Sequence, residues 1–158
     1  MSKLSHVNEA GEANMVDVSE KSESRRMAVA EGLIRMAPDT LREILEQGVP
    51  KGDVLAVARV AGIQAAKRCS DLIPLCHPLP ITKVTVDFQA TGEDSILVQA
   101  EVRVSGKTGV EMEALTAASI AALTVYDMLK SVDRAMTLSK TYLESKTGGK
   151  SGTFLRTA

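Results

Sequence analysis

One stretch of the chain is apolar or small on every side of a helix. Residues 110–130 contain no glycine or proline and consist largely of good helix formers, so they predict a helix. Between residues 114 and 125 only three hydroxyl side chains interrupt the alanines and larger apolar residues. A helix without a solvated face belongs inside a large core or between subunits. We therefore expect this helix to lie at the centre of the fold.

Alternating apolar and polar positions predict strands elsewhere in the chain. They fall at residues 25–36, 81–90, 96–104 and 135–145, with a turn at 91–94 and a possible short strand at 15–19. Residues 25–36 alternate only loosely and could also be held in a helix. Pro38 and Asp39 open a short helix over residues 40–46, and Asp53 caps a longer helix that ends near Ser70.

The order of these elements from residue 25 on is strand, two helices, strand, strand, helix, strand. This split βαβ pattern with an extra helix predicts an α+β plait with an antiparallel sheet and helices on one face. The 158 residues suit a single domain. Residues 1–14 and about 147–158 are polar or rich in glycine, and we expect them to be flexible. The sheet face without helices needs cover, which favours an oligomer.

Composition narrows the classes of function. The net charge is only −1, so nothing draws the whole protein to nucleic acid or to a membrane surface. Aromatic residues make up 3% of the chain and tryptophan is absent, which argues against stacking on single-stranded nucleic acid. Two cysteines do not make a disulfide scaffold, and no membrane span or leader is recognisable. We expect a soluble cytoplasmic protein with no nucleic-acid or membrane partner.

Charged side chains mark both ends of the central helix. Glu113 lies near its start, where the helix dipole favours an anion, whereas Asp127 lies in its last turn and opposes the dipole. Lys130 shares a face with Asp127, so the two form either a surface ion pair or a couple for proton transfer. Glu113 and Asp127 are separated by roughly 21 Å along a helix. A site therefore uses one end of the helix, or takes opposite ends from different subunits.

A stiff loop and a set of basic residues are further candidates for chemistry. Residues 71–80 contain three prolines, so His77, between Cys76 and Pro78, is held at a fixed angle, either for a ligand or merely for a backbone carbonyl. Cys69, Cys76 and His77 do not have the spacing of a structural zinc site, and we predict no resident metal. Segments 106–108 and 149–151 imitate a P-loop but lack its earlier glycine.

Basic residues gather where regular elements end. They either converge on a pocket for an anion or are scattered solubilising charges. The set comprises Lys51, Lys67, Lys107, Lys130, Lys146, Lys150, Arg26 and Arg68.

Several long segments resemble one family. The segments are KGDVLAVARVAGIQAAKR, DLIPLCHPL, SGKTGVEMEALTAAS, ALTVYDM and GGKSG, together with HVNEAGEANMVDVS near the start. They are similar to the cyclic pyranopterin monophosphate synthase family, the C protein of molybdenum cofactor biosynthesis. The resemblance implies a ferredoxin-like fold, assembled as a hexamer that is a trimer of dimers, with sites at a subunit interface. It also implies a lyase that converts (8S)-3',8-cyclo-7,8-dihydroguanosine 5'-triphosphate to cyclic pyranopterin monophosphate and releases pyrophosphate.

The resemblance also implies roles for individual residues. Asp127 matches the catalytic aspartate of the family, and Lys130 and Lys51 match further catalytic groups. The residues that match substrate-binding positions are Leu75, Cys76, His77, Met112, Glu113, Lys67 and Lys146, with Glu111, Arg26 and Lys150 in addition. No cofactor is implied, although Mg²⁺ could accompany the triphosphate.

Two other classes of function stay open at this point. A binding module could sense a purine nucleotide or pterin through the same lysines and Glu113 without turning it over. A subunit with only a structural role in an oligomer would need neither nucleotide binding nor turnover. The position of Asp127 beside Lys130 favours the enzyme.

Overall fold

A computed structural model describes residues 4–46 and 53–157 of the chain. Its helices and strands lie close to the predicted positions. In chain order they are β1 (Ser24–Arg35), α1 (Pro38–Leu45), α2 (Val54–Lys67), α3 (Cys69–Leu72), β2 (Ile81–Thr91), β3 (Ser95–Gly106), α4 (Glu111–Leu129), β4 (Thr137–Thr147) and β5 (Phe154–Leu155). Residues 25–36, whose pattern also allowed a helix, thus lie mostly in strand β1. The Asp53 side chain caps α2, as predicted, by accepting a hydrogen bond from the Ala56 N–H at 3.0 Å.

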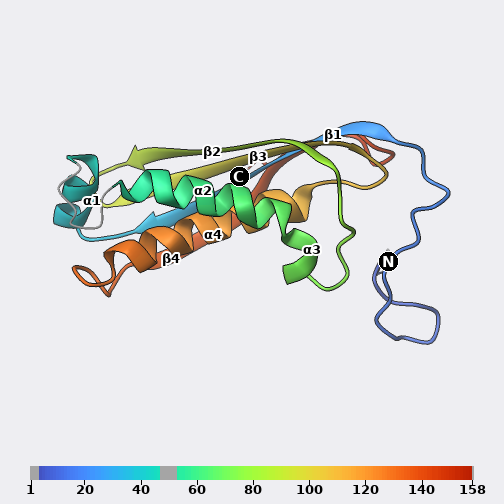
Figure 1. Ribbon diagram of the computed structural model, residues 1–158, viewed down its shortest axis with the longest axis horizontal. Helices are drawn as coiled ribbons and strands as arrows, with labels where there is room; N and C mark the ends of the chain where they lie inside the picture. Colours follow the sequence, from blue (N-terminus) through green and yellow to red (C-terminus); the bar gives the residue numbers. More distant parts are fainter. Residues whose placement is uncertain (1–3, 47–52, 158) are drawn as a thin grey trace.

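The strands form one antiparallel sheet in the order β2-β3-β1-β4-β5. Strands β1 and β3 are adjacent in the middle and pair along their whole length, although three helices and a strand separate them in sequence. Each crossover therefore passes over a neighbouring strand, which is the ferredoxin-like plait that the sequence predicted. Helices α2 and α4 lie on the same side of β2 and β3 (Figure 1).

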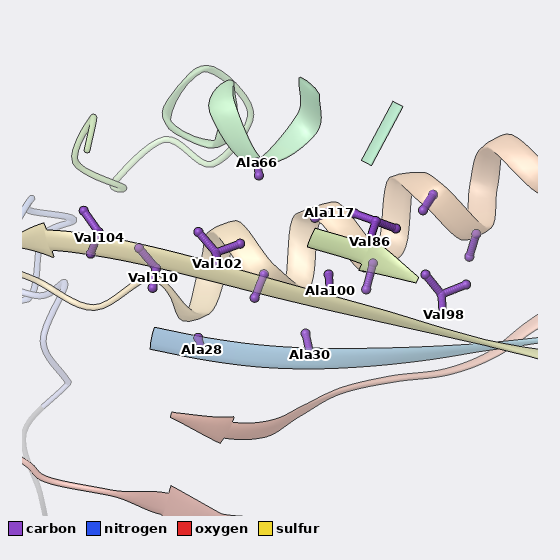
Figure 2. Packing of buried hydrophobic residues seen from close by; sticks show 14 residues of the cluster. Ala28, Ala30, Ala66, Val86, Val98, Ala100, Val102, Val104, Val110 and Ala117 are labelled. Atoms are coloured by element: carbon purple, nitrogen blue, oxygen red, sulfur yellow. The ribbon is translucent and has the colours of Figure 1, made fainter. Parts of the chain in front are cut away.

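The centre of the core is α4, as predicted from its lack of a polar face. Ala114, Ala117, Ala118 and Ala121 are fully buried. They meet the short residues of β1 and the valines of β3, and Figure 2 shows Ala117 above Ala100 with Ala28 and Ala30 below. Small side chains let backbones approach closely, so the packing is tight without large aromatic residues.

The structure corrects two local expectations. The helix beginning after Asp53 does not run to Ser70, because the Arg68 N–H is shared between the carbonyls of Gln64 and Ala65, which tightens the last turn and ends α2. The short strand at residues 15–19 is absent, because the Asp17 side chain bonds the backbone locally and competes with extended pairing. The glycine-rich tail contains β5, which pairs with β4, and the flexibility expected at both ends of the chain stays a prediction.

The sheet face opposite the helices is mixed in character. Glu31 accepts hydrogen bonds from the Tyr142 hydroxyl at 2.8 Å and from the Gln99 amide at 2.9 Å. Half-buried leucines such as Leu33 and Leu97 flank this network. The face can therefore meet water or another protein surface, and the oligomer stays a prediction.

One helix of the described chain, α4, is long and apolar enough to cross a membrane by composition alone. Its buried face packs on α2 and the sheet, and a helix in the core of a fold is also expected to be apolar.

A substitution at Gly62 should test the tight approach of α2 to α4. A Cβ atom at Gly62 would lie 3.0 Å from the Ala117 carbonyl oxygen and 3.2 Å from the Ala121 Cβ. We expect Gly62→Val to lower the free energy of unfolding by about 2–3 kcal/mol in urea titrations, because backbone cannot give way cheaply. The control is Gln64→Val, which puts the same side chain on the exposed side of α2 and should change the free energy of unfolding by less than about 0.5 kcal/mol. Equal effects would contradict the close approach.

Candidate active site

Polar groups cluster at both ends of α4. At its C-terminal end the Lys130 Nζ lies 2.8 Å from the Asp127 Oδ1, and both side chains are exposed. The hydrogen bond and the charge of Asp127 raise the pKa of Lys130. The predicted pairing is therefore confirmed, and it is an open, charged pair that a ligand could reach.

The N-terminal end of α4 holds a buried carboxyl group. Glu113 is only 3% exposed, and burial raises its pKa to about 7 although a backbone N–H bond and the Cys69 thiol favour the ionised form. Burial also raises the pKa of Cys69 to about 12, and it raises the pKa of the neighbouring Cys76. The Cys69 Sγ lies 3.6 Å from the Thr116 hydroxyl. This end of α4 thus holds two neutral thiols beside a buried carboxyl group whose pKa lies near neutral pH.

The loop between α3 and β2 brings His77 to the same end of the molecule. Its start is fixed by backbone bonds from the Ile73 N–H to the Cys69 carbonyl and from the Cys76 N–H to the Ile73 carbonyl, and its prolines restrict the rest. The His77 Nε2 lies 2.6 Å from the Val16 carbonyl oxygen. The structure therefore shows that His77 bonds a backbone carbonyl from within the stiff loop beside Cys76. Its role in binding a ligand stays a prediction.

Two glycine-containing turns surround Arg26 at the start of β1. Its guanidinium donates to the Gly106 carbonyl at 3.1 Å and to the Lys107 carbonyl at 3.2 Å. Gly148 and Gly149 both have positive φ, and a Cβ at Gly149 would overlap the guanidinium. Glycine is needed at both positions because the backbone has the positive φ of the left-handed region, and at Gly149 also because a side chain would collide with Arg26.

A cleft of about 720 Å³ opens beside Arg26. It is lined by Glu20, Lys21, Ser22, Ser24, Arg26, Gly149, Lys150 and Ser151. Basic and hydroxyl side chains predominate, and this mixture suits a phosphate group. The buried Ser24 Oγ has no hydrogen-bond partner within the described part of the chain. Near this cleft, Lys146 bonds the Ser151 hydroxyl and lies 3.8 Å from the Glu111 carboxylate.

The predicted site residues divide between the two ends of α4. Those at or near its N-terminal end are Arg26, Leu75, Cys76, His77, Glu111, Met112, Glu113, Lys146 and Lys150, with Lys67 exposed at the nearby end of α2. Asp127 and Lys130 lie at the other end. Lys51 falls outside the described residues. The roles assigned to these side chains stay predictions.

Several neighbours of the site were not recognised in the sequence. Lys21, Ser22 and Ser24 line the cleft, and Asp17 lies near the side chains of His77 and Lys107. The signal that could have found them is the polar run that leads into β1 and ends at Arg25 and Arg26. No group of three His, Cys, Asp or Glu side chains able to hold a metal occurs among residues 4–46 and 53–157. The expectation of no resident metal still rests on the sequence.

Fold and site together define a class of protein: an α+β plait with a cleft, lined mainly by basic and hydroxyl side chains, near the N-terminal end of its core helix. Comparisons with known proteins then identify the family. The MoaC family model matches residues 15–149. A protein of Thermomicrobium roseum named cyclic pyranopterin monophosphate synthase is 57% identical over 157 residues, covering 99% of this chain and 95% of the relative. The chain belongs to the MoaC family, as its resemblance indicated.

The pKa of Glu113 predicts how stability depends on pH. The folded carboxyl group has a pKa of about 7 against 4.5 for a free one, so between these values the folded state keeps a proton that the unfolded state has lost. Stability from this group therefore falls as pH rises through this window. Glu113→Gln should raise the free energy of unfolding by about 1–3 kcal/mol at pH about 8 and change it little at pH about 4.5.

The control for this prediction is Glu111→Gln in the same helical turn. Its carboxylate is partly exposed and faces Lys146, and its charge raises the pKa of Glu113 less than burial does, so its loss should stabilise the protein at alkaline pH much less than Glu113→Gln. Urea titrations at both pH values would measure the two variants. An equal gain in both would show that burial of Glu113 is not the cause.

Proposed function

We propose that the protein is a cyclic pyranopterin monophosphate synthase, a lyase of molybdenum cofactor biosynthesis. Its substrate would be (8S)-3',8-cyclo-7,8-dihydroguanosine 5'-triphosphate, its products cyclic pyranopterin monophosphate and pyrophosphate, and its location the cytoplasm. The observation that carries the proposal is the 57% identity, along 99% of this chain, to the relative that bears this name. The chemistry of the candidate site supports it independently.

The N-terminal end of α4 suits the two parts of such a substrate. A carboxylate at Glu113 can accept hydrogen bonds from the N–H edge of a guanine-like ring, and binding there would favour its ionised form. Arg26, Lys146 and Lys150 can hold phosphate groups and stabilise departing pyrophosphate. Side-chain hydrogen bonds to the ring take the place of aromatic stacking in a chain with few aromatic residues. Mg²⁺ could still enter with the triphosphate.

Proton transfers would fall to Asp127 with Lys130 or Lys51. The reaction must open the imidazole part of the purine, form the pterin and close a cyclic phosphate, and each step moves protons. Asp127 is separated from Glu113 by roughly 21 Å along α4, too far for one substrate atom to touch both within one chain. We therefore propose sites that take opposite ends of α4 from two subunits.

Exposed apolar side chains on the helical side support self-association. Leu123 on α4 is 50% exposed, and Val57 and Val60 on α2 are 44% and 55% exposed. Burying such a surface against a second copy would remove apolar area from water. We propose a homo-oligomer, in its full form a hexamer built as a trimer of dimers.

Replacing Asp127 separates catalysis from binding. Asp127→Ala should leave nucleotide affinity within about threefold but lower the rate of pyrophosphate release at least about a hundredfold, because proton transfer is lost. The matched control is Asp39→Ala, since Asp39 and Arg42 form another exposed pair three residues apart at 2.8 Å. Calorimetry and a pyrophosphate assay would measure both variants. Unchanged turnover in Asp127→Ala would remove Asp127 from the mechanism.

Mixing inactive variants tests whether two chains share each site. Glu113→Gln and Asp127→Ala should each be inactive, but after subunit exchange about a quarter of the sites would combine two intact halves. Glu113→Gln mixed with Lys146→Ala is the control, because both changes fall at the same end of one chain and should not complement. Failure of the first mixture, with exchange demonstrated by native mass spectrometry, would indicate that one chain supplies the whole site.

A further inference from the structure

A short turn before β1, Val16–Ser19, connects the two loops that carry site residues. The Val16 carbonyl oxygen meets His77 at 2.6 Å, and the Ser19 carbonyl oxygen accepts from the Lys107 Nζ at 3.4 Å. These contacts join segments that are 61 and 88 residues apart in the sequence. The chain before β1 runs down toward the connection between α3 and β2 (Figure 1). Neither contact belongs to the sheet or the core.

The turn is held in shape by one carboxylate. The Asp17 Oδ1 accepts from the Ser19 N–H at 2.9 Å and from the Ser19 hydroxyl at 2.6 Å, which is an Asx turn. These bonds lower the pKa of Asp17, and the charge of Lys107 lowers it further. Asp17 is itself exposed, so local bonding and not burial fixes the backbone that presents the two carbonyls.

The Val16 carbonyl decides which nitrogen of His77 carries the proton. A carbonyl oxygen can only accept, so the Nε2 must be the donor. In the neutral ring the Nδ1 is then free of hydrogen and becomes the acceptor. Without the carbonyl the ring could rotate or exchange tautomers. The contact therefore sets both the orientation of His77 and the atom that it can offer to a ligand.

We propose that Val16–Ser19 is a positioning element for the reaction and that Asp17 is a positioning residue acting through His77. The turn holds the Nε2–H on Val16 so that the Nδ1 accepts a hydrogen bond from an N–H or O–H group of the substrate. This inference rests on the proposed function for its kinetic test. The geometry of His77 itself can be tested without turnover.

Kinetics with three variants separate shape from charge. Asp17→Ala loses both turn bonds and should lower kcat on the order of tenfold with KM within about twofold, because a misplaced group costs rate more than binding. Asp17→Asn keeps an oxygen that can accept both bonds and should retain most of kcat. The control is Asn8→Ala, which removes a similar turn on the Ala10 and Glu12 N–H groups of the same segment and should leave kcat unchanged.

The spectroscopic readout does not depend on activity. The chain has two histidines, so a His6→Gln background leaves His77 as the one imidazole observed by ¹⁵N-edited NMR. We expect its Nε2–H proton to exchange slowly with water, to keep doing so in Asp17→Asn, and to exchange fast in Asp17→Ala. If the wild type shows this signal but no turnover of the proposed nucleotide, the function fails and the positioning of His77 stands.

Each remaining outcome decides the inference. An unchanged signal or an unchanged kcat in Asp17→Ala overturns it, and equal losses in Asp17→Asn and Asp17→Ala assign the effect to charge and overturn it as well. If Asp17→Ala does not fold, Ser19→Ala takes its place, because it removes the hydroxyl bond alone. Faster imidazole exchange with a smaller loss of kcat would then support the inference, and wild-type behaviour would overturn it.

Discussion

The close packing of α4 against α2 and the sheet governs where chemistry can occur in this protein. The alanines of α4 lie against Gly62 on one side and against the short residues of β1 and β3 on the other. Such contacts leave no room for a charged side chain along the middle of the helix, where burial without a partner would cost several kcal/mol. Functional polar groups are therefore confined to its two ends, and the need for two subunits in the proposed site follows from that confinement.

The two ends treat similar carboxyl groups differently. Glu113 stands where the helix dipole favours an anion, yet burial dominates and raises its pKa to about 7. Asp127 stands where the dipole disfavours an anion, yet it is exposed and paired with Lys130. Environments that differ in this way suit the two roles proposed for these carboxyl groups, hydrogen bonding for Glu113 and proton transfer for Asp127.

A recurring device holds the site together: a polar side chain is fixed by the backbone carbonyl of a remote segment. Arg26 is held by Gly106 and Lys107, His77 by Val16, and Lys107 in turn by Ser19. Backbone carbonyls do not titrate, so the acceptor in each of these bonds is the same at any pH. Loops that would otherwise move independently are thereby tied into a single arrangement around the cleft.

The sequence by itself determined the elements whose causes are local. The helix α4, the cap at Asp53, the order of helices and strands along the chain and the pairing of Asp127 with Lys130 follow from periodicity, propensity and short spacing, and the matched segments indicated the family. Only the tertiary structure decided the end of α2, the turn at Asp17, strand β5, the cleft at Ser24 and the carbonyl that meets His77. Each of these depends on hydrogen bonds or close contacts whose geometry no residue pattern encodes, because the partners are chosen when the chain folds.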